Sequence, residues 1–127
     1  GVRELLEALK AEGHILYVAT SKPEQMSIAI LEHFDLAKYF DRICGATMDT
    51  SRTNKEAVIA YLLNQNECTD HIVMVGDTKF DVIGAKSHGI PCIGVSWGYG
   101  TVAEMQEAGA VSIADTMQAL LEILKTI

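Results

Sequence analysis

Residues 72–81 read Ile-Val-Met-Val-Gly-Asp-Thr-Lys-Phe-Asp, an apolar run followed at once by two carboxylates. The run at 72–75 is typical of a strand buried in a parallel sheet, and the residues after it favour a helix. Gly76 allows a tight turn or the close approach of a ligand between the two. Asp77 and Asp81 are four residues apart, so their carboxylates can face one point, where they would repel each other. A hard divalent cation such as Mg²⁺ would relieve that repulsion. In the structural alternative, Asp77 caps the helix and Asp81 interacts with its dipole.

The same alternation of short apolar strands and amphipathic helices extends along the whole chain. We expect strands at 15–19, 42–45, 72–75, 92–95 and 111–113, and helices at 2–12, 21–33, 53–63, 80–87, 101–107 and 115–124. Such alternation predicts β-α-β units with right-handed crossovers. The expected fold class is α/β, a three-layer, Rossmann-like parallel sheet with helices on both faces. Ligands bind beyond the carboxyl ends of the strands in such sheets, so functional side chains are expected there.

Three of the expected helices begin with a capping residue. Ser21 and Glu24 have the spacing of a capping box, and Thr53 and Glu56 repeat it. Asp115 is expected to cap the last helix.

The composition is that of an ordinary globular domain. The chain has 127 residues, of which 49% are hydrophobic and 21% charged, enough for one domain with a core. The formal net charge of −7 argues against a nucleic-acid polymer or an anionic membrane as partner. No apolar run approaches the ~20 residues of a membrane helix. Cys44, Cys68 and Cys92 lack CxxC spacing, so we expect free thiols and a cytoplasmic location.

Hydroxyl and ammonium groups lie at two further strand-to-helix junctions. Thr20, Ser21 and Lys22 follow the strand at 15–19, where the free N–H groups of a helix start would help to hold a phosphate. Lys55 lies in the first turn of a helix, where the dipole disfavours a cation, so another group is expected to attract its ammonium. In the structural alternative, Thr20 and Ser21 are ordinary caps and Lys55 is a surface lysine.

Residues 98–103 fit a different pattern, the G-x-G-x-x-A of dinucleotide-binding loops. This stretch comes late in the chain, whereas a dinucleotide fingerprint normally opens its domain. Asp115 lies downstream but follows no convincing second strand of a dinucleotide unit. A nicotinamide or flavin site would also leave Asp77, Asp81 and Lys55 unexplained, so this interpretation is disfavoured.

Taken together, these motifs resemble the haloacid dehalogenase-like hydrolase superfamily, and most closely its phosphoglycolate phosphatase-like members. Residues 16–23 look like the family's second motif, with Thr20 at the position of the phosphate-binding hydroxyl. Lys55 matches the lysine of the third motif, and residues 74–81 match the fourth. The stretch 84–100 is similar as well, so the resemblance covers nearly the whole chain.

The resemblance implies a Mg²⁺-dependent phosphatase that hydrolyses small phosphate monoesters through an aspartyl-phosphate. It implies a phosphate site made by Thr20, Ser21, Lys22 and Lys55. It implies that Asp77 holds the metal with Asp81 as the supporting acid of the metal site, and that Thr20, Lys55 and Asp81 have catalytic roles. The implied partner is a small phosphorylated metabolite, such as phosphoglycolate or a nucleotide.

The sequence departs from the family pattern at the first motif, D-x-D-x-T/V. No Asp-x-Asp occurs anywhere in the chain. In the family, this motif supplies the nucleophile and the general acid/base, on a strand between those ending at Thr20 and Gly76. The cap domain, on which substrate choice largely depends, is missing too. We therefore expect residues 1–127 to be a partial core domain of a longer protein, inactive alone and self-associating through exposed strand edges.

A second hypothesis belongs to another class of function. The chain is then a non-catalytic phosphate- or metal-binding module, or a subunit that a partner completes. Binding of Mg²⁺ and phosphate without turnover would favour it. Among enzymes of the same superfamily, a 5′-nucleotidase, a pyrophosphatase and a sugar-phosphate mutase stay open. Trp97 and Tyr99 either line the entrance of the site or are packing residues.

Overall fold

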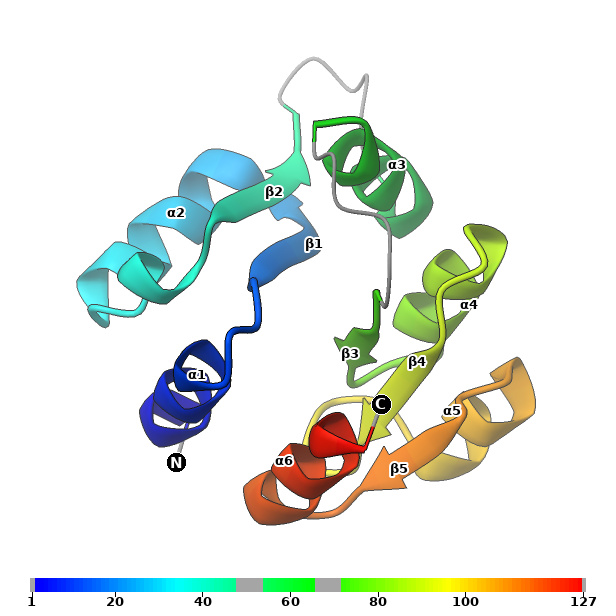
Figure 1. Ribbon diagram of the computed structural model, residues 1–127. Helices are drawn as coiled ribbons and strands as arrows, with labels where there is room; N and C mark the ends of the chain where they lie inside the picture. The colour runs from blue at the N-terminus through cyan, green and yellow to red at the C-terminus, as the bar shows by residue number, and fades with distance from the viewer. Residues whose placement is uncertain (1, 48–53, 66–71, 127) are drawn as a thin grey trace. The chain divides into compact units, whose positions relative to one another are not determined.

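A computed structural model describes residues 2–47, 54–65 and 72–126 of the chain. The chain folds as two compact units, Gly1–Glu67 and Cys68–Ile127. Figure 1 colours them from blue to green and from green to red.

The first unit is built on two parallel strands. Its elements are α1 (Val2–Ala11), β1 (Tyr17–Pro23), α2 (Glu24–His33), the short 3-10 helix η1 (Ala37–Tyr39), β2 (Arg42–Ala46) and α3 (Lys55–Gln65). Tyr17 pairs with Arg42 at the start of the ladder. Both α2 and α3 pack on the two strands, from opposite sides in Figure 1. The α1 helix contacts η1, where the Tyr39 hydroxyl donates to a Glu7 carboxylate oxygen at 2.8 Å.

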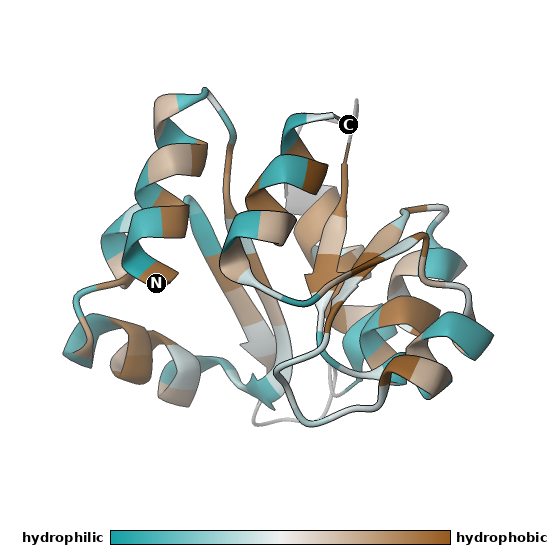
Figure 2. Ribbon diagram, turned by 90° about the horizontal axis from the view of Figure 1, so that it is seen from below, coloured by the Kyte–Doolittle hydropathy of each residue, from teal (hydrophilic) through white to brown (hydrophobic). Residues whose placement is uncertain are grey.

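The second unit is built on three parallel strands in the order β3-β4-β5. Its elements are β3 (Met74–Gly76), α4 (Lys79–Ser87), β4 (Cys92–Val95), α5 (Val102–Ala108), β5 (Ser112–Ala114) and α6 (Met117–Lys125). Every residue of the central strand β4 is buried. The core cluster joins this strand to α4 and α5 through Val82, Ala85, Cys92 and Met105. Figure 2 shows apolar and polar residues alternating around the helices, as helices that cover a sheet require.

The predicted fold class is confirmed: all described strand pairs are parallel, and helices flank both sheets. The expectation that the runs at 15–19 and 72–75 are fully buried is wrong. Ile15 is 53% exposed and Val75 39% exposed. Ile15 lies before β1, which begins at Tyr17, and Val75 lies in β3, which pairs with one strand in the described part of the chain, whereas β4 pairs with two.

The first of the expected helix starts is wrong as well. β1 continues through Pro23, and α2 begins at Glu24 without a side-chain cap. The Ser21–Glu24 capping box therefore does not form. A carboxylate oxygen of Glu24 instead accepts the backbone N–H of Gly45 in β2, at 3.1 Å. A hydrogen bond between the start of α2 and the strand β2 has thus replaced the local capping box.

Neighbouring residues cap the other two helices. Thr53 lies outside the described residues, and the Asn54 side-chain oxygen accepts the Ala57 N–H at 2.8 Å at the start of α3. Asp115 does not cap α6, because the Thr116 hydroxyl accepts the Ala119 N–H at 3.0 Å there.

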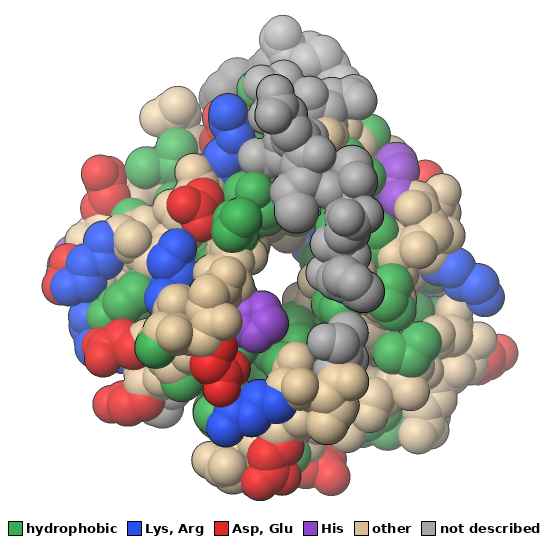
Figure 3. Space-filling view, viewed as in Figure 1, with side chains coloured by type: hydrophobic (Ala, Val, Ile, Leu, Met, Phe, Trp, Pro, Cys, Tyr) green, Lys and Arg blue, Asp and Glu red, His purple; other side chains and the backbone are tan. Residues whose placement is uncertain are grey.

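The described surface is mixed in charge. Exposed ion pairs join Lys10 to Asp41 at 3.2 Å and Lys79 to Glu104 at 3.4 Å. Figure 3 shows acidic and basic side chains interspersed over the face that it presents. Among the described helices, none has the length and apolar character needed to cross a membrane.

Candidate active site

In the first unit, Lys55 reaches the middle of β1, where the regular pairing with β2 ends. It is the first residue of α3, and its Nζ donates to the backbone carbonyl of Ala19 at 3.0 Å. This carbonyl oxygen is one group that attracts the ammonium despite its place at a helix N-terminus. Because Ala19 precedes Thr20, the Lys55 ammonium contacts β1 one residue before the motif residue Thr20.

Thr20 itself lies in β1, so the expectation that it opens a helix is wrong. Its hydroxyl accepts the Lys22 N–H at 3.2 Å, and it still has a proton to donate. The ladder register between β1 and β2 shifts between Ala19 and Pro23, so residues 20–22 bulge out of the regular pairing. Thr20 is half-buried, and Ser21 and Lys22 are exposed. The local N–H groups here are those of a bulged strand end and not of a helix start.

In the second unit, Asp81 is buried beneath the turn that joins β3 to α4. Asp81 is 4% exposed. Oδ2 accepts the Asp77 N–H at 3.0 Å, the Thr78 N–H at 3.2 Å and the Thr78 hydroxyl at 3.3 Å. A Cβ at Gly76 would overlap the Asp81 side chain, so glycine is required for this packing. Asp81 therefore fixes the backbone from which Asp77 projects.

Asp77 follows β3 directly and is half-buried. The alternative in which Asp77 caps α4 is wrong, because the N-cap residue is Thr78. The Asp77 carboxylate oxygen Oδ2 accepts the backbone N–H of Tyr99 at 3.1 Å. The other oxygen, Oδ1, takes part in no hydrogen bond with the described residues, which leaves this oxygen for another ligand.

The motifs and their geometry agree with a comparison of protein families. Residues 1–95 match the family of haloacid dehalogenase-like hydrolases. The chain belongs to this family. The resemblance that the sequence motifs indicated is confirmed.

Two curated relatives of the haloacid dehalogenase-like chain carry phosphatase names. A 5′-nucleotidase of Pseudomonas aeruginosa is 39% identical over 99% of this chain and 58% of its own length. A phosphoglycolate phosphatase of Vibrio parahaemolyticus is 28% identical over 97% of this chain and 54% of its own length. The chain therefore spans little more than half the length of these relatives.

A solved structure supports the fold assignment. The crystal structure of a predicted phosphatase from Clostridium acetobutylicum is 42% identical and superposes with a TM-score of 0.96. The match covers 100% of this chain and 59% of that protein.

The second unit of this haloacid dehalogenase-like chain fits the Mg²⁺ that its family implies. Mg²⁺ is usually bound by one or two carboxylates together with phosphate oxygens and water. Asp77 offers one carboxylate oxygen without a hydrogen bond in the described structure, and Asp81 accepts the backbone N–H of Asp77. No group of three or more His, Cys, Asp or Glu side chains suitable for a metal occurs among residues 2–47, 54–65 and 72–126.

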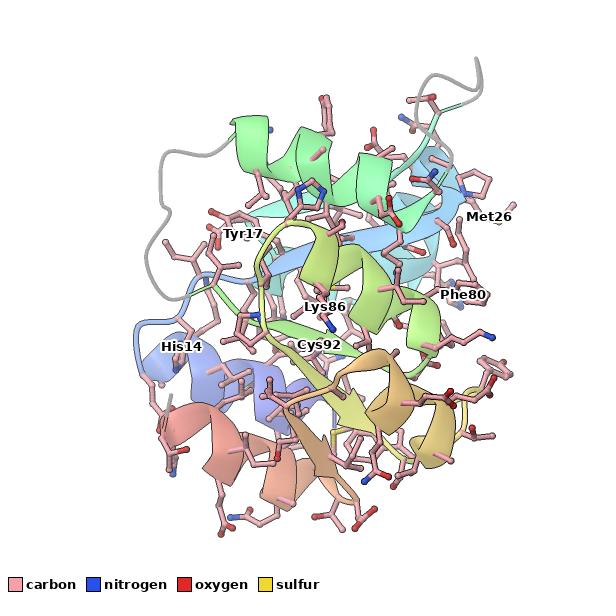
Figure 4. All side chains as sticks on the ribbon, turned by 90° about the vertical axis from the view of Figure 1, so that its right-hand side faces the viewer. His14, Tyr17, Met26, Phe80, Lys86 and Cys92 are labelled. Carbon is pink, nitrogen blue, oxygen red and sulfur yellow. The ribbon has the colours of Figure 1, made fainter. Side chains whose placement is uncertain are left out.

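The sequence left open whether Trp97 and Tyr99 line the entrance of the site or are packing residues. The structure shows Tyr99 to be 97% exposed and Trp97 44% exposed, so packing does not account for Tyr99. Sequence reasoning missed that the backbone of this loop contacts Asp77. The pair Gly98 and Gly100 was the available signal, although its spacing also fits the disfavoured dinucleotide pattern. Phe80, 63% exposed, lies at the start of α4, at the outer end of the helix in Figure 4.

Proposed function

We propose that the protein containing this chain is a Mg²⁺-dependent phosphatase of small phosphate monoesters, such as phosphoglycolate or a nucleotide. Membership of the haloacid dehalogenase-like hydrolases and the phosphatase names of the relatives support this proposal. The observation that carries it is the hydrogen bond from Lys55 to Ala19, since it brings an ammonium to the backbone carbonyl of the residue before Thr20.

In this proposal, the first unit holds the phosphoryl group. The Thr20 hydroxyl donates to a phosphoryl oxygen, and the exposed Ser21 and Lys22 add contacts at the same strand end. The Lys55 ammonium neutralises the nucleophile and the charge that develops on the phosphoryl oxygens. Fixed charges of this kind stabilise a transition state more than water does, because they need not reorganise.

The second unit holds the metal in the same proposal. Asp77 would be the metal ligand through the oxygen that Tyr99 leaves available, and Asp81 keeps the Asp77 backbone in place. When bound, Mg²⁺ would neutralise phosphate charge and orient the substrate.

The nucleophile of this reaction lies outside the chain, since no Asp-x-Asp occurs in it. In the full-length protein, a carboxylate oxygen would attack phosphorus while the alcohol oxygen of the substrate leaves, and a general acid protonates that oxygen. Water would then cleave the acyl phosphate and release inorganic phosphate. We therefore expect the 127-residue chain alone to show no turnover.

The test is a phosphate-release assay of the full-length protein with Mg²⁺ and a panel of 5′-nucleotides, phosphoglycolate and sugar phosphates. Lys55→Ala should reduce kcat about 10²–10³-fold, the usual cost of removing one stabilising group from such a site. Lys38→Ala is a matched control, because Lys38 pairs with Asp35 at 3.0 Å on η1, outside the proposed site. A Lys55→Ala enzyme as active as the control would contradict the proposed role.

The absence of Asp-x-Asp favours a second candidate, a non-catalytic phosphate- or metal-binding module or a subunit that a partner completes. Calorimetry with Mg²⁺ and inorganic phosphate separates the two. Binding with no turnover on any ester of the panel would support the module, whereas turnover by the full-length protein would exclude it.

A further inference from the structure

Two consecutive residues of the loop between β4 and α5 donate hydrogen bonds to Asp77. The Tyr99 N–H donates to the carboxylate oxygen Oδ2 at 3.1 Å. The Gly100 N–H donates to the Asp77 backbone carbonyl at 2.9 Å. Side chain and main chain of the same aspartate are thus fixed by adjacent N–H groups.

Glycine is required in this loop because its backbone lies very close to Asp77, and not because the backbone conformation excludes other residues. A Cβ at Gly98 would overlap the Cβ and Oδ2 of Asp77, and one at Gly100 would overlap the Asp77 carbonyl. Neither glycine has a positive φ, unlike Gly89 and Gly109. An alanine at 98 would therefore adopt the backbone conformation without strain but would displace the carboxylate or the loop.

The loop is also anchored on both sides of its contact with Asp77. Before it, the Ser96 N–H donates to the Ala114 carbonyl at the end of β5, at 3.0 Å. After it, the Thr101 hydroxyl accepts the Glu104 N–H at 3.2 Å and caps α5. Glu104 in turn pairs with Lys79, the first residue of α4, at 3.4 Å. These anchors leave the loop little freedom to follow a displaced carboxylate.

We infer that residues 97–100 are a positioning element that aims the Asp77 carboxylate at the metal. The Tyr99 N–H binds Oδ2 and so restrains the orientation of the carboxylate, and Oδ1 would be the oxygen available to a cation. The loss of a group that hydrogen-bonds a metal ligand and orients it typically lowers metal affinity 10–100-fold. The inference rests on the proposed function, because it assigns Asp77 as a metal ligand.

The test measures Mn²⁺ affinity by calorimetry, with Mn²⁺ as a probe for Mg²⁺, on the full-length protein and on Gly98→Ala. We expect the Kd of Gly98→Ala to rise 10–100-fold. Gly94→Ala is the matched control: its Cβ would lie 2.8 Å from the side-chain ends of Ile113 and Met105, so it strains the core of the same unit without touching Asp77. It should lower the melting temperature without metal and leave the Kd within about twofold of wild type, a change of about 0.4 kcal/mol.

Three outcomes distinguish the inference from the function on which it rests. If Asp77→Asn loses Mn²⁺ binding but Gly98→Ala binds as wild type does, the inference is wrong and the metal site stands. If Asp77→Asn binds as tightly as wild type, or if wild type does not bind, both are wrong. If Gly98→Ala does not fold, Gly100→Ala takes its place, with the same expected rise in Kd, and a wild-type Kd again overturns the inference.

Discussion

Removal of the Asp81 carboxylate should destabilise the second unit strongly. One oxygen of this buried side chain accepts two backbone N–H groups and one hydroxyl, from Asp77 and Thr78. A hydrogen bond to a charged group contributes about 1.5–3 kcal/mol, and water can replace part of the loss in a half-buried turn. For Asp81→Ala we expect the free energy of unfolding to fall by about 3 kcal/mol. Asp81→Asn keeps an acceptor oxygen and should cost about 1 kcal/mol.

Urea unfolding followed by circular dichroism measures the change, and amide hydrogen exchange locates it. The Asp77 and Thr78 amides should lose protection in Asp81→Ala before the rest of β3 does. Asp115→Ala is the control, because Asp115 is exposed and makes no hydrogen bond with the described residues. It should change stability by less than about 0.5 kcal/mol. An Asp81→Ala protein as stable as this control, with protected amides at 77 and 78, would refute the reasoning.

Two further predictions concern the ends of helices. Thr116→Ala should lower the free energy of unfolding in urea by about 1 kcal/mol, because the Thr116 hydroxyl caps α6. A larger loss of stability in Asp115→Ala than in Thr116→Ala would show instead that Asp115 is the cap, as the sequence predicts. The pKa of Glu104 is lowered from its ordinary value by the Thr101 hydroxyl and then by Lys79, so its contribution to stability is present at neutral pH and is lost as the pH falls through that lowered pKa. In Lys79→Met the Glu104 pKa should rise toward the ordinary value, which NMR titration of its side chain would show, and an unchanged pKa would contradict the pairing.

Much of the second unit could be predicted from sequence because its signals are local. The strand at 92–95 follows a Gly-Ile-Pro turn, and its four residues are the buried central strand. The helix expected at 80–87 begins one residue earlier, at Lys79. The pair Asp77 and Asp81 was found because both residues flank a strand end, where function is concentrated in such folds.

Other features depend on contacts that spacing does not record. The capping-box spacing of Ser21 and Glu24 could not show that Glu24 would bond Gly45, twenty-one residues later in β2. The exposure of Val75 depends on whether a strand lies beside β3, which the residues of the strand itself do not reveal. The contact to Asp77 comes from a backbone N–H, and every residue type except proline has one.

Asp77 and Asp81 both accept hydrogen bonds from the backbone, and this has a consequence for the sequence around them. Asp81 accepts backbone N–H groups of its own turn, and Asp77 accepts that of Tyr99. Because the donor at position 99 belongs to the main chain, the arrangement constrains the side chain there only weakly, whereas at position 78 the threonine hydroxyl donates to Asp81 as well. It constrains Gly76 and Gly98 strongly, since a Cβ at either position would overlap an aspartate side chain. The positions of these two carboxylates therefore depend on the close approach of neighbouring backbone segments, which glycine permits.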